Sequence, residues 1–317
     1  TNQLGETYAV GQFKNTVDFD AGPGFDIINA NIITPQGNAG FITKTDNAGN
    51  HLWAKALIPY ATNGGSIIYD VAVDMNGNVY VAGVYNKAID FDPGAAIDSL
   101  NVSGTAGSFV MKLDAAGNFL WAKTFLDINT VMRSIKTDQN NNVIISGFFN
   151  VTVDFDPGPA VFNLTPTNVM EVCLLKLDSN GDFIWAKSWV NSRPNLGTLA
   201  KNNLDIDNGN NIYLSGKIIN DSIDLDPGAG VYTDSGNSFV LKIDASANFI
   251  WGHGTSAPTS LVCVSKYGDL YVAGTPSGLA TKSYLSKYDI AGTALWVKIL
   301  PDSIVQGQYF IGNVNAL

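Results

Sequence analysis

The chain has 317 residues, of which 45% are hydrophobic, and a formal net charge of −10 at pH 7. Its acidic residues are 26 Asp and only 2 Glu, and its basic residues include only 2 Arg, so we expect neither nucleic acid nor an anionic membrane surface as a partner. No apolar run approaches bilayer-spanning length, which argues against membrane insertion. Because Asp favours turns where Glu favours helices, the composition predicts a chain poor in helices and rich in loops.

Three strand signatures recur in a fixed order along the chain. The first is Tyr-x-x-Gly, with Ile for Tyr in the third copy, and it ends at Gly11, Gly83, Gly147, Gly216 and Gly274. The second is a strand end of the form Lys-x-Asp, at Lys44/Asp46, Lys112/Asp114, Lys176/Asp178, Lys242/Asp244 and Lys287/Asp289. The third is a Trp seven residues after that Asp, at Trp53, Trp121, Trp185, Trp251 and Trp296. Such constant spacing indicates five structural repeats.

Turn residues separate these strands. Asn47-Ala-Gly49-Asn50, for example, joins a Lys-x-Asp strand to a Trp strand, and its Gly is available for positive φ. From the second copy on, another hairpin precedes the Tyr-x-x-Gly strand, as at Val71-Ala-Val-Asp74 followed by Asn76-Gly77-Asn78. Each repeat is therefore predicted to be four antiparallel strands, and repeated four-stranded units without helical periodicity are typical of a β-propeller.

We predict an all-β fold: a single β-propeller domain over residues 1–317 with five four-stranded blades. The predicted blades are residues 1–58 plus 305–317, 66–127, 131–190, 199–255 and 259–300. The first repeat lacks an innermost strand, and the tail from Gln308 to Val314 lies where such a strand is due, so we expect the C-terminal strand to pair into blade 1 and close the ring. Alternatively, Tyr309 to Gly312 starts a sixth repeat of a larger ring.

An acidic motif, Asp-x-Asp, lies between the second and third strands of four repeats and is absent from the fifth. Its carboxylates are Asp18, Asp20, Asp90, Asp92, Asp154, Asp156, Asp224 and Asp226. Pro-Gly follows three of the copies and turns the chain, and an Asn stands shortly before each copy. Because alternate residues of an extended chain point to the same side, each motif presents two carboxylates together. The strand order places all four motifs on one face, where we expect an acidic rim.

Calcium is the cofactor that this motif suggests, because paired carboxylates, a nearby Asn and backbone carbonyls supply hard oxygen ligands. The alternative is structural: each Asp accepts hydrogen bonds from backbone N–H groups of its own loop, while Phe19, Phe91, Phe155 and Leu225 fill the gap between blades. The motif is not an EF-hand and lacks a bidentate Glu, so the sequence leaves both readings open.

The repeated Trp and Lys residues favour structural roles. Each Trp lies inside an alternating apolar strand, which favours packing between blades over stacking on a sugar ring. Each Lys stands two residues from an Asp on the same side of its strand, and we expect these residues to form a solvated charge ladder rather than a ligand site.

We find no catalytic residue that the sequence singles out. His51 and His253 are the only histidines, and no Ser or Cys lies in a nucleophile-elbow setting. The alternative is a carbohydrate-active hydrolase with two carboxylates facing each other across the propeller funnel. However, the motif carboxylates are equivalent copies, whereas catalysis needs one site that differs from its repeats.

The second repeat carries a resemblance to a known family. Gly77-Asn-Val-Tyr80-Val-Ala-Gly83, Asp90-Phe-Asp-Pro-Gly94 and Lys112-Leu-Asp114 followed by Gly117-Asn-Phe-Leu-Trp121-Ala-Lys123 resemble the repeats of secreted β-propeller proteins of Bacteroidota, known as SBBP-like repeats. The resemblance implies export, by a type IX secretion route, and a place at the cell surface or in the extracellular matrix. No C-terminal sorting domain typical of such proteins is seen.

Together, these observations predict a secreted, non-enzymatic β-propeller that serves as a binding, adhesion or structural assembly module and is stabilised by calcium. The partners we expect are surface glycans, other cell-surface or matrix proteins, or further copies of the chain.

Overall fold

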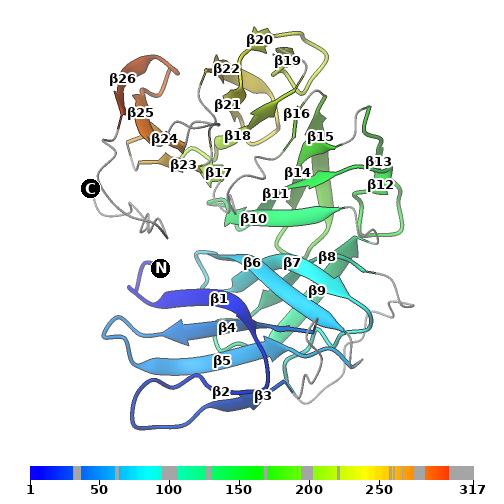
Figure 1. Ribbon diagram of the computed structural model, residues 1–317, viewed down its shortest axis with the longest axis vertical. Coiled ribbons are helices and arrows are strands. Elements are labelled where there is room, and N and C mark those ends of the chain that lie inside the picture. Colours follow the sequence, from blue (N-terminus) through cyan, green and yellow to red (C-terminus); the bar gives the residue numbers. More distant parts are fainter. Residues whose placement is uncertain are drawn as a thin grey trace. The chain divides into compact units, whose positions relative to one another are not determined.

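The computed structural model describes residues 1–30, 37–60, 64–94, 106–125, 130–167, 170–190, 192–193, 203–219, 222–256, 259, 261–265, 267–274 and 283–299. These residues form 26 strands and no helix. The strands make five larger antiparallel sheets and three two-stranded sheets (Figure 1). Among the described residues, no helix is long and apolar enough to cross a membrane.

The five larger sheets follow the order of the sequence repeats and are numbered here as sheets 1 to 5. Sheet 1 is β1 (Thr7–Phe13), β4 (Ala39–Thr45) and β5 (His51–Leu57). Sheet 2 is β6 (Gly65–Val73), β7 (Val79–Asn86), β8 (Gly107–Leu113) and β9 (Phe119–Phe125). Sheet 3 is β10 (Val131–Thr137), β11 (Val143–Phe149), β14 (Glu171–Leu177) and β15 (Phe183–Trp189).

Sheets 4 and 5 complete the series. In sheet 4, both β16 (Ser192–Arg193) and β17 (Leu204–Ile206) pair with β18 (Ile212–Ile218), followed by β21 (Ser238–Ile243) and β22 (Phe249–Thr255). Sheet 5 is β23 (Leu261–Val264), β24 (Leu270–Gly274), β25 (Tyr284–Tyr288) and β26 (Ala294–Ile299). The predicted order of strands within each repeat is therefore confirmed.

The hairpin predicted between the Lys-x-Asp and Trp strands is present, and its register recurs. Lys44 pairs with Trp53 across β4 and β5, and the same Lys–Trp pairing recurs in sheets 2, 4 and 5. Asp46 stabilises the turn, since its Oδ1 accepts hydrogen bonds from the backbone N–H groups of Ala48 and Asn50 at 2.9 and 2.8 Å. Gly49 follows with φ 86°, a conformation in which glycine avoids a steric cost.

The Gly of the Tyr-x-x-Gly strand is needed for close packing. A Cβ atom added to Gly83 would lie 2.1 Å from the carbonyl oxygen of Ile67 and 2.8 Å from Cε1 of Phe109 on the neighbouring strand. Gly216 has the same relationship to Phe239, at 2.6 Å. A side chain at this position would therefore displace the aromatic ring of the third strand.

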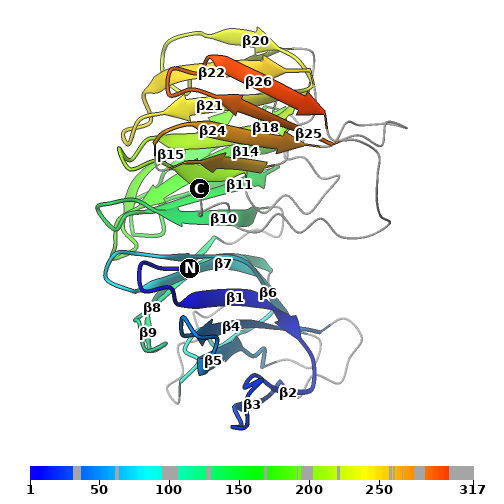
Figure 2. The same cartoon turned by 90° about the vertical axis from the view of Figure 1, so that its left-hand side faces the viewer.

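The chain divides into two compact units, one formed by residues 1–165 and 174–186 and the other by residues 166–173 and 187–317. Unit 1 has a core that includes Ile42, Leu57, Val81, Phe91 and Phe109. Its strands include β1 to β9, which are labelled in Figures 1 and 2. The core of unit 2 is built from Tyr213, Val240, Trp251, Leu270, Val272 and their neighbours.

The fold is thus all-β and propeller-like. The count of five blades, the single domain and the closure of the ring stay predictions. The tail that we expect to close blade 1, residues 305–317, lies outside the described residues, and so does the alternative sixth repeat from Tyr309 to Gly312.

Candidate functional site

Three of the four Asp-x-Asp motifs form the turn of a small hairpin inserted between the second and third strands of a sheet. These hairpins are β2 (Thr16–Asp18) with β3 (Ile27–Asn29), β12 (Val153–Asp154) with β13 (Asn163–Leu164), and β19 (Ser222–Asp224) with β20 (Thr233–Ser235). The first Asp of each motif ends the first strand of the hairpin. In the second copy, the described part ends at Gly94.

Backbone N–H groups of the same loop bind the motif carboxylates. In the fourth copy, Asp224 Oδ1 accepts hydrogen bonds from the N–H groups of Asp226 and Tyr232 at 3.1 and 2.8 Å. Asp226 Oδ1 accepts one from Gly228 at 2.7 Å. The first and third copies have the same three bonds, and the second copy has the two that fall within its described residues.

This hydrogen bonding bears on whether the motif fits calcium. Oδ1 of each motif Asp already accepts one or two N–H groups, and N–H groups are donors that repel a cation. The described residues include no cluster of three or more His, Cys, Asp or Glu side chains that could hold a metal ion. The geometry matches the self-capped alternative, and calcium binding by these eight carboxylates stays a prediction.

The apolar residue between the two Asp residues is a buried plug. Phe91, Phe155 and Leu225 have no exposed surface. The Phe155 ring packs against Phe149 of its own sheet, with a centroid distance of 5.4 Å, and against Phe125 at the end of the preceding sheet, at 6.3 Å. Phe155 therefore fills the space between two successive sheets, as the structural alternative predicted, whereas Phe19 is half-buried and packs on Phe13 and Phe41 of its own sheet.

Each hairpin also contacts the last strand of its own sheet, the strand that carries the repeated Trp. Asp26, next to β3, accepts the backbone N–H of Ala54 at 3.0 Å (β2, β3 and β5 in Figure 1). Asp234 in β20 accepts the N–H of Gly254 at 2.8 Å. Both N–H groups belong to edge strands, whose unpaired backbone groups invite pairing with another chain.

An aromatic pair joins two of the hairpins to this strand, and a His–Asp hydrogen bond replaces it in the first. Phe162 packs on Phe183 and Tyr232 on Phe249, each with a ring-centroid distance of 4.8 Å. The corresponding pair in the first repeat is Asp26 with His51, whose Nε2 lies 2.7 Å from Asp26 Oδ2.

Each described hairpin exposes a large apolar side chain at one shared position. Phe25, Val161 and Val231 occupy the same position, seven residues after the first Asp of the motif, and are 81%, 69% and 79% exposed. Ile97 has this position in the second copy and lies outside the described residues. The three described residues are called the hairpin tips below.

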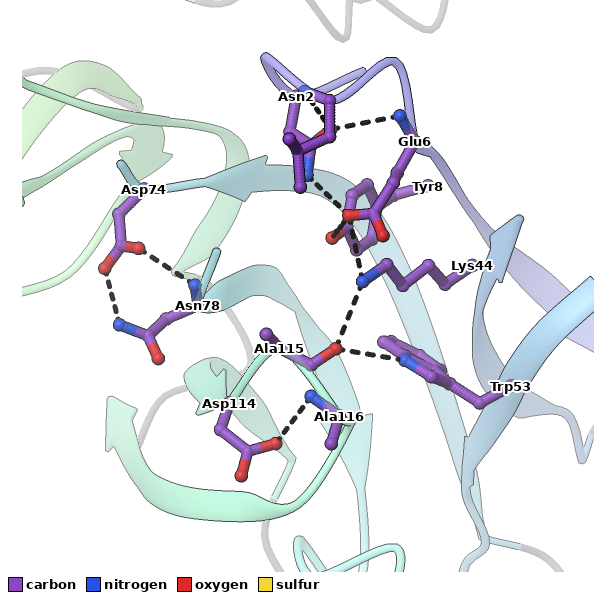
Figure 3. A network of polar contacts seen from close by, with 11 residues as sticks. Asn2, Glu6, Tyr8, Lys44, Trp53, Asp74, Asn78, Asp114, Ala115 and Ala116 are labelled. Atoms are coloured by element: carbon purple, nitrogen blue, oxygen red, sulfur yellow. Dashed lines mark hydrogen bonds and ion pairs between the residues drawn. The ribbon is translucent and has the colours of Figure 1, made fainter. Parts of the chain in front are cut away.

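The repeated Lys and Trp residues join neighbouring sheets within each unit. Lys44 Nζ and Trp53 Nε1 both donate to the carbonyl oxygen of Ala115, in the last turn of sheet 2, at 3.2 and 3.3 Å (Figure 3). Gly117 follows in the same turn, and a Cβ added there would lie 3.2 Å from the Trp53 ring. The Trp thus packs between sheets, as predicted.

The same contact recurs along the chain and is called the Lys–Trp latch. Lys112 Nζ and Trp121 Nε1 donate to the carbonyl of Ser179 at 2.8 and 3.1 Å. Trp251 Nε1 donates to the carbonyl of Ile290 at 3.1 Å.

The prediction that the lysines form a solvated ladder is wrong. Lys44, Lys112, Lys176 and Lys242 are buried. Lys176 Nζ lies 2.9 Å from Asp138 Oδ2, and Lys242 Nζ lies 3.3 Å from Asp207 Oδ2. The carboxylate comes from the first hairpin of the sheet, not from the Lys-x-Asp motif, and this partner makes burial of the ammonium group possible.

A Glu plays the same part in sheet 1. Lys44 Nζ lies 2.9 Å from Glu6 Oε2, beside the ring of Tyr8 (Figure 3). Burial is the largest single effect and opposes charging of Lys44, but the hydrogen bonds and charge interactions with Glu6 and Tyr8 together outweigh it and raise the pKa of Lys44. In sheet 2, burial instead lowers the pKa of Lys112, against the opposing effect of Asp74 and Asp178.

Both histidines contact neighbouring side chains. His51 contacts Asp26, and the His253 ring stacks on Trp251 and Tyr288 with centroid distances of 5.5 and 6.1 Å. Sequence reasoning missed the Asp26–His51 pair. The signal was available, since both positions are aromatic in the third and fourth repeats and polar in the first.

Comparison with known proteins supports a repeat fold. No family model matches the chain. A segment of 156 residues, 46% of the chain, is 26% identical to an uncharacterized WD repeat-containing protein of Acanthamoeba polyphaga mimivirus, of which the match covers 11%. The chain therefore matches only about a tenth of the length of this relative. With the all-β repeats, this similarity supports a propeller-like repeat protein.

Similarity to solved structures is weak. A protein of unknown function from Bacteroides caccae aligns over 82% of this chain and 89% of its own, with 10% identity and a TM-score of 0.34. An apocarotenoid oxygenase variant from Synechocystis aligns over 85% of this chain and 57% of its own, with 10% identity and a TM-score of 0.42. These values carry no inference about activity.

Proposed function

We propose that this chain is an extracellular, non-enzymatic propeller-like module that assembles with further copies of itself through the hairpin tips. The observation that carries the proposal is the repeated exposure of Phe25, Val161 and Val231 at one position of the repeat. A single exposed apolar residue is ordinary on a protein surface. Recurrence at one position in three hairpins is not explained by packing, because the neighbouring plug residues already fill the space between sheets.

The hairpins are suited to this role because their backbone is held rigidly. The hydrogen bonds of the motif carboxylates fix each turn before any partner arrives, which lowers the conformational entropy lost on binding. When several tips of one chain bind at the same time, their weak individual affinities combine into a higher overall affinity. The net charge of −10 opposes self-association, so we expect assembly to strengthen as salt concentration rises.

An extracellular location rests on the resemblance of the repeats to secreted Bacteroidota proteins. It agrees with the scarcity of basic residues, which disfavours nucleic acid as a partner.

Sedimentation velocity over a series of protein concentrations tests the proposal. The test variant carries Phe25→Ser, Ile97→Ser, Val161→Ser and Val231→Ser, and we expect it to stay monomeric where the natural chain associates. The matched control carries Met75→Ser, Tyr267→Ser and Ile290→Ser, which replace equally exposed residues of other turns and should leave association unchanged. A natural chain that is monomeric throughout, or equal association of test and control variants, would overturn the proposal.

A further inference from the structure

The last strand of sheet 5 exposes a row of apolar side chains. Leu295, Val297 and Ile299 alternate along β26, so they point to the same side of the strand, and they are 50%, 61% and 67% exposed. β26 is the final strand of its sheet, and among the described residues it pairs only with β25 (β26 in Figure 1). An exposed, apolar edge strand is a surface that another chain can bind.

In other sheets, an Asp-x-Asp hairpin covers the last strand at the position that follows the Trp. Asp26 of the first hairpin binds the backbone N–H of Ala54, and Ala54 is buried. Ala186, at the same position in sheet 3, is buried too. In sheet 5 this position is Val297, and the fifth repeat has no Asp-x-Asp motif. A hairpin from another copy of the chain would supply the cover that this repeat does not encode.

Charge also distinguishes the fifth repeat. Residues 261–299 include four Lys and two Asp, a net charge of +2, whereas each of the other four repeats is net negative. Lys298 lies on β26 itself and is exposed. Complementary charges steer two surfaces together and fix their register. This local attraction offsets part of the repulsion that the net charge of −10 causes between two copies, and it favours an acidic partner segment on sheet 5.

The first hairpin matches this surface best. Ile27 lies two residues after the tip residue Phe25 and is 59% exposed, whereas the third and fourth hairpins have Asn and Thr at this position. Phe25 and Ile27 therefore form a short apolar row on alternate residues, the same spacing as the row on β26. Residues 16–29 include three Asp and no basic residue, so the hairpin is opposite in charge to the fifth repeat.

We propose that the apolar row of β26 binds the first hairpin of a second copy, with Phe25 and Ile27 packed on Val297 and Ile299. This inference rests on the proposed function and names the surface that a hairpin tip binds. The two surfaces belong to different parts of the chain, so the contact is head-to-tail. Each copy binds one neighbour through its hairpin and another through β26, which produces rows or closed rings instead of a symmetric dimer.

Sedimentation velocity of the full chain tests the role of β26. The face variant carries Val297→Thr and Ile299→Thr, and it should fold because both side chains are exposed and Thr is also a β-branched residue that favours strands. We expect it to raise the dissociation constant for association roughly tenfold or more, since two apolar contacts are lost. The matched control carries Leu120→Thr and Ile184→Thr, which are exposed on the last strands of sheets 2 and 3, and should associate like the natural chain.

A mixing experiment tests the head-to-tail contact. The variant in which Phe25, Ile97, Val161 and Val231 are replaced by Ser keeps β26, and the face variant keeps its hairpins. We therefore expect neither to associate alone at a concentration where the natural chain does. An equimolar mixture of the two should form a 1:1 complex that does not grow further, because each partner lacks the surface needed to add the next copy.

The proposed function and this inference fail in different ways. A natural chain that is monomeric, or whose association survives replacement of the tips, would overturn both. If replacing the tips abolishes association but the folded face variant associates like the natural chain, only the role of β26 is overturned. A mixture of the two variants that stays monomeric would likewise overturn the head-to-tail contact while leaving assembly through the tips in place.

Discussion

Leu225 packs directly on Gly252, since a Cβ atom added to Gly252 would lie 2.8 Å from Leu225 Cδ1. This contact explains a sequence pattern in the strands that follow each Trp. Where a plug residue is present, the first and third residues after Trp are small, as at Ala54 and Ala56; the pairs are Ala/Ala, Ala/Thr, Ala/Ser and Gly/Gly. The fifth repeat lacks the motif and has Val297 and Ile299, which are 61% and 67% exposed. Residue size on this strand therefore follows the presence of the plug.

We expect Gly252→Val to destabilise the protein by about 1–3 kcal/mol, because two methyl groups would overlap the Leu225 side chain. Urea-induced unfolding measures the change. Leu225→Ala alone should cost about 2–5 kcal/mol because this side chain is fully buried. The double variant should lose less than the sum of the two single losses, which a clash with any other residue would not allow. Ile250→Val, on the same strand but half-exposed, is the control and should change the free energy of unfolding by no more than about 0.5 kcal/mol.

Removal of a buried lysine should be costly because it leaves its carboxylate unpaired. Lys242→Met leaves Asp207 buried with hydrogen bonds from Gly209, Asn211 and Tyr213 but without this cation, and we expect a loss of roughly 3–5 kcal/mol in the free energy of unfolding. Lys287→Met breaks a more exposed pair with Asp269 and should cost clearly less. Equal losses at the two sites, measured by chemical denaturation, would contradict the role assigned to burial.

Acid should destabilise the fold by protonating Asp138 and Asp207, the carboxylates that lie in the first turns of sheets 3 and 4. Burial alone would raise the pKa of Asp138, but hydrogen bonds from Asn142 and Lys176 lower it below the ordinary value of 3.8. The pKa of Asp207 is lowered in the same way by Asn211. Because the folded pKa is depressed, this stabilisation is complete above the unfolded value of 3.8 and is lost as the pH falls below it. The free energy of unfolding, measured down a pH series, should fall less steeply in this range for Asp138→Asn.

The calcium prediction is tested by thermal unfolding of chelator-treated protein, with and without added calcium. The hydrogen bonds of Asp224 and Asp226 predict that Asp224→Asn with Asp226→Asn lowers the midpoint equally in both buffers. A calcium site at one hundred times its dissociation constant would instead add about 2.7 kcal/mol, and the variant would lose it. A rise with calcium that disappears in the variant would establish the motif as a metal loop.

The repeats made much of the fold predictable, because equal spacing of Lys, Asp and Trp in five copies leaves few ways to pair the strands. The repeats did not, however, predict that Lys176 and Lys242 are buried. A repeat shows that positions are equivalent, but whether they face solvent depends on a carboxylate about 35 residues away, such as Asp138 or Asp207, and on the neighbouring sheet.

The Lys–Trp latch uses a peptide carbonyl as its acceptor, and the residues that supply it are Ala115, Ser179 and Ile290. Every amino acid carries a backbone carbonyl, so residues of the turn can be substituted without loss of this contact between sheets. If a repeat were duplicated within the gene, the turn of the new sheet would already carry the carbonyl acceptor for the preceding sheet. Such proteins can therefore gain or lose whole repeats while the contact between neighbouring sheets is kept.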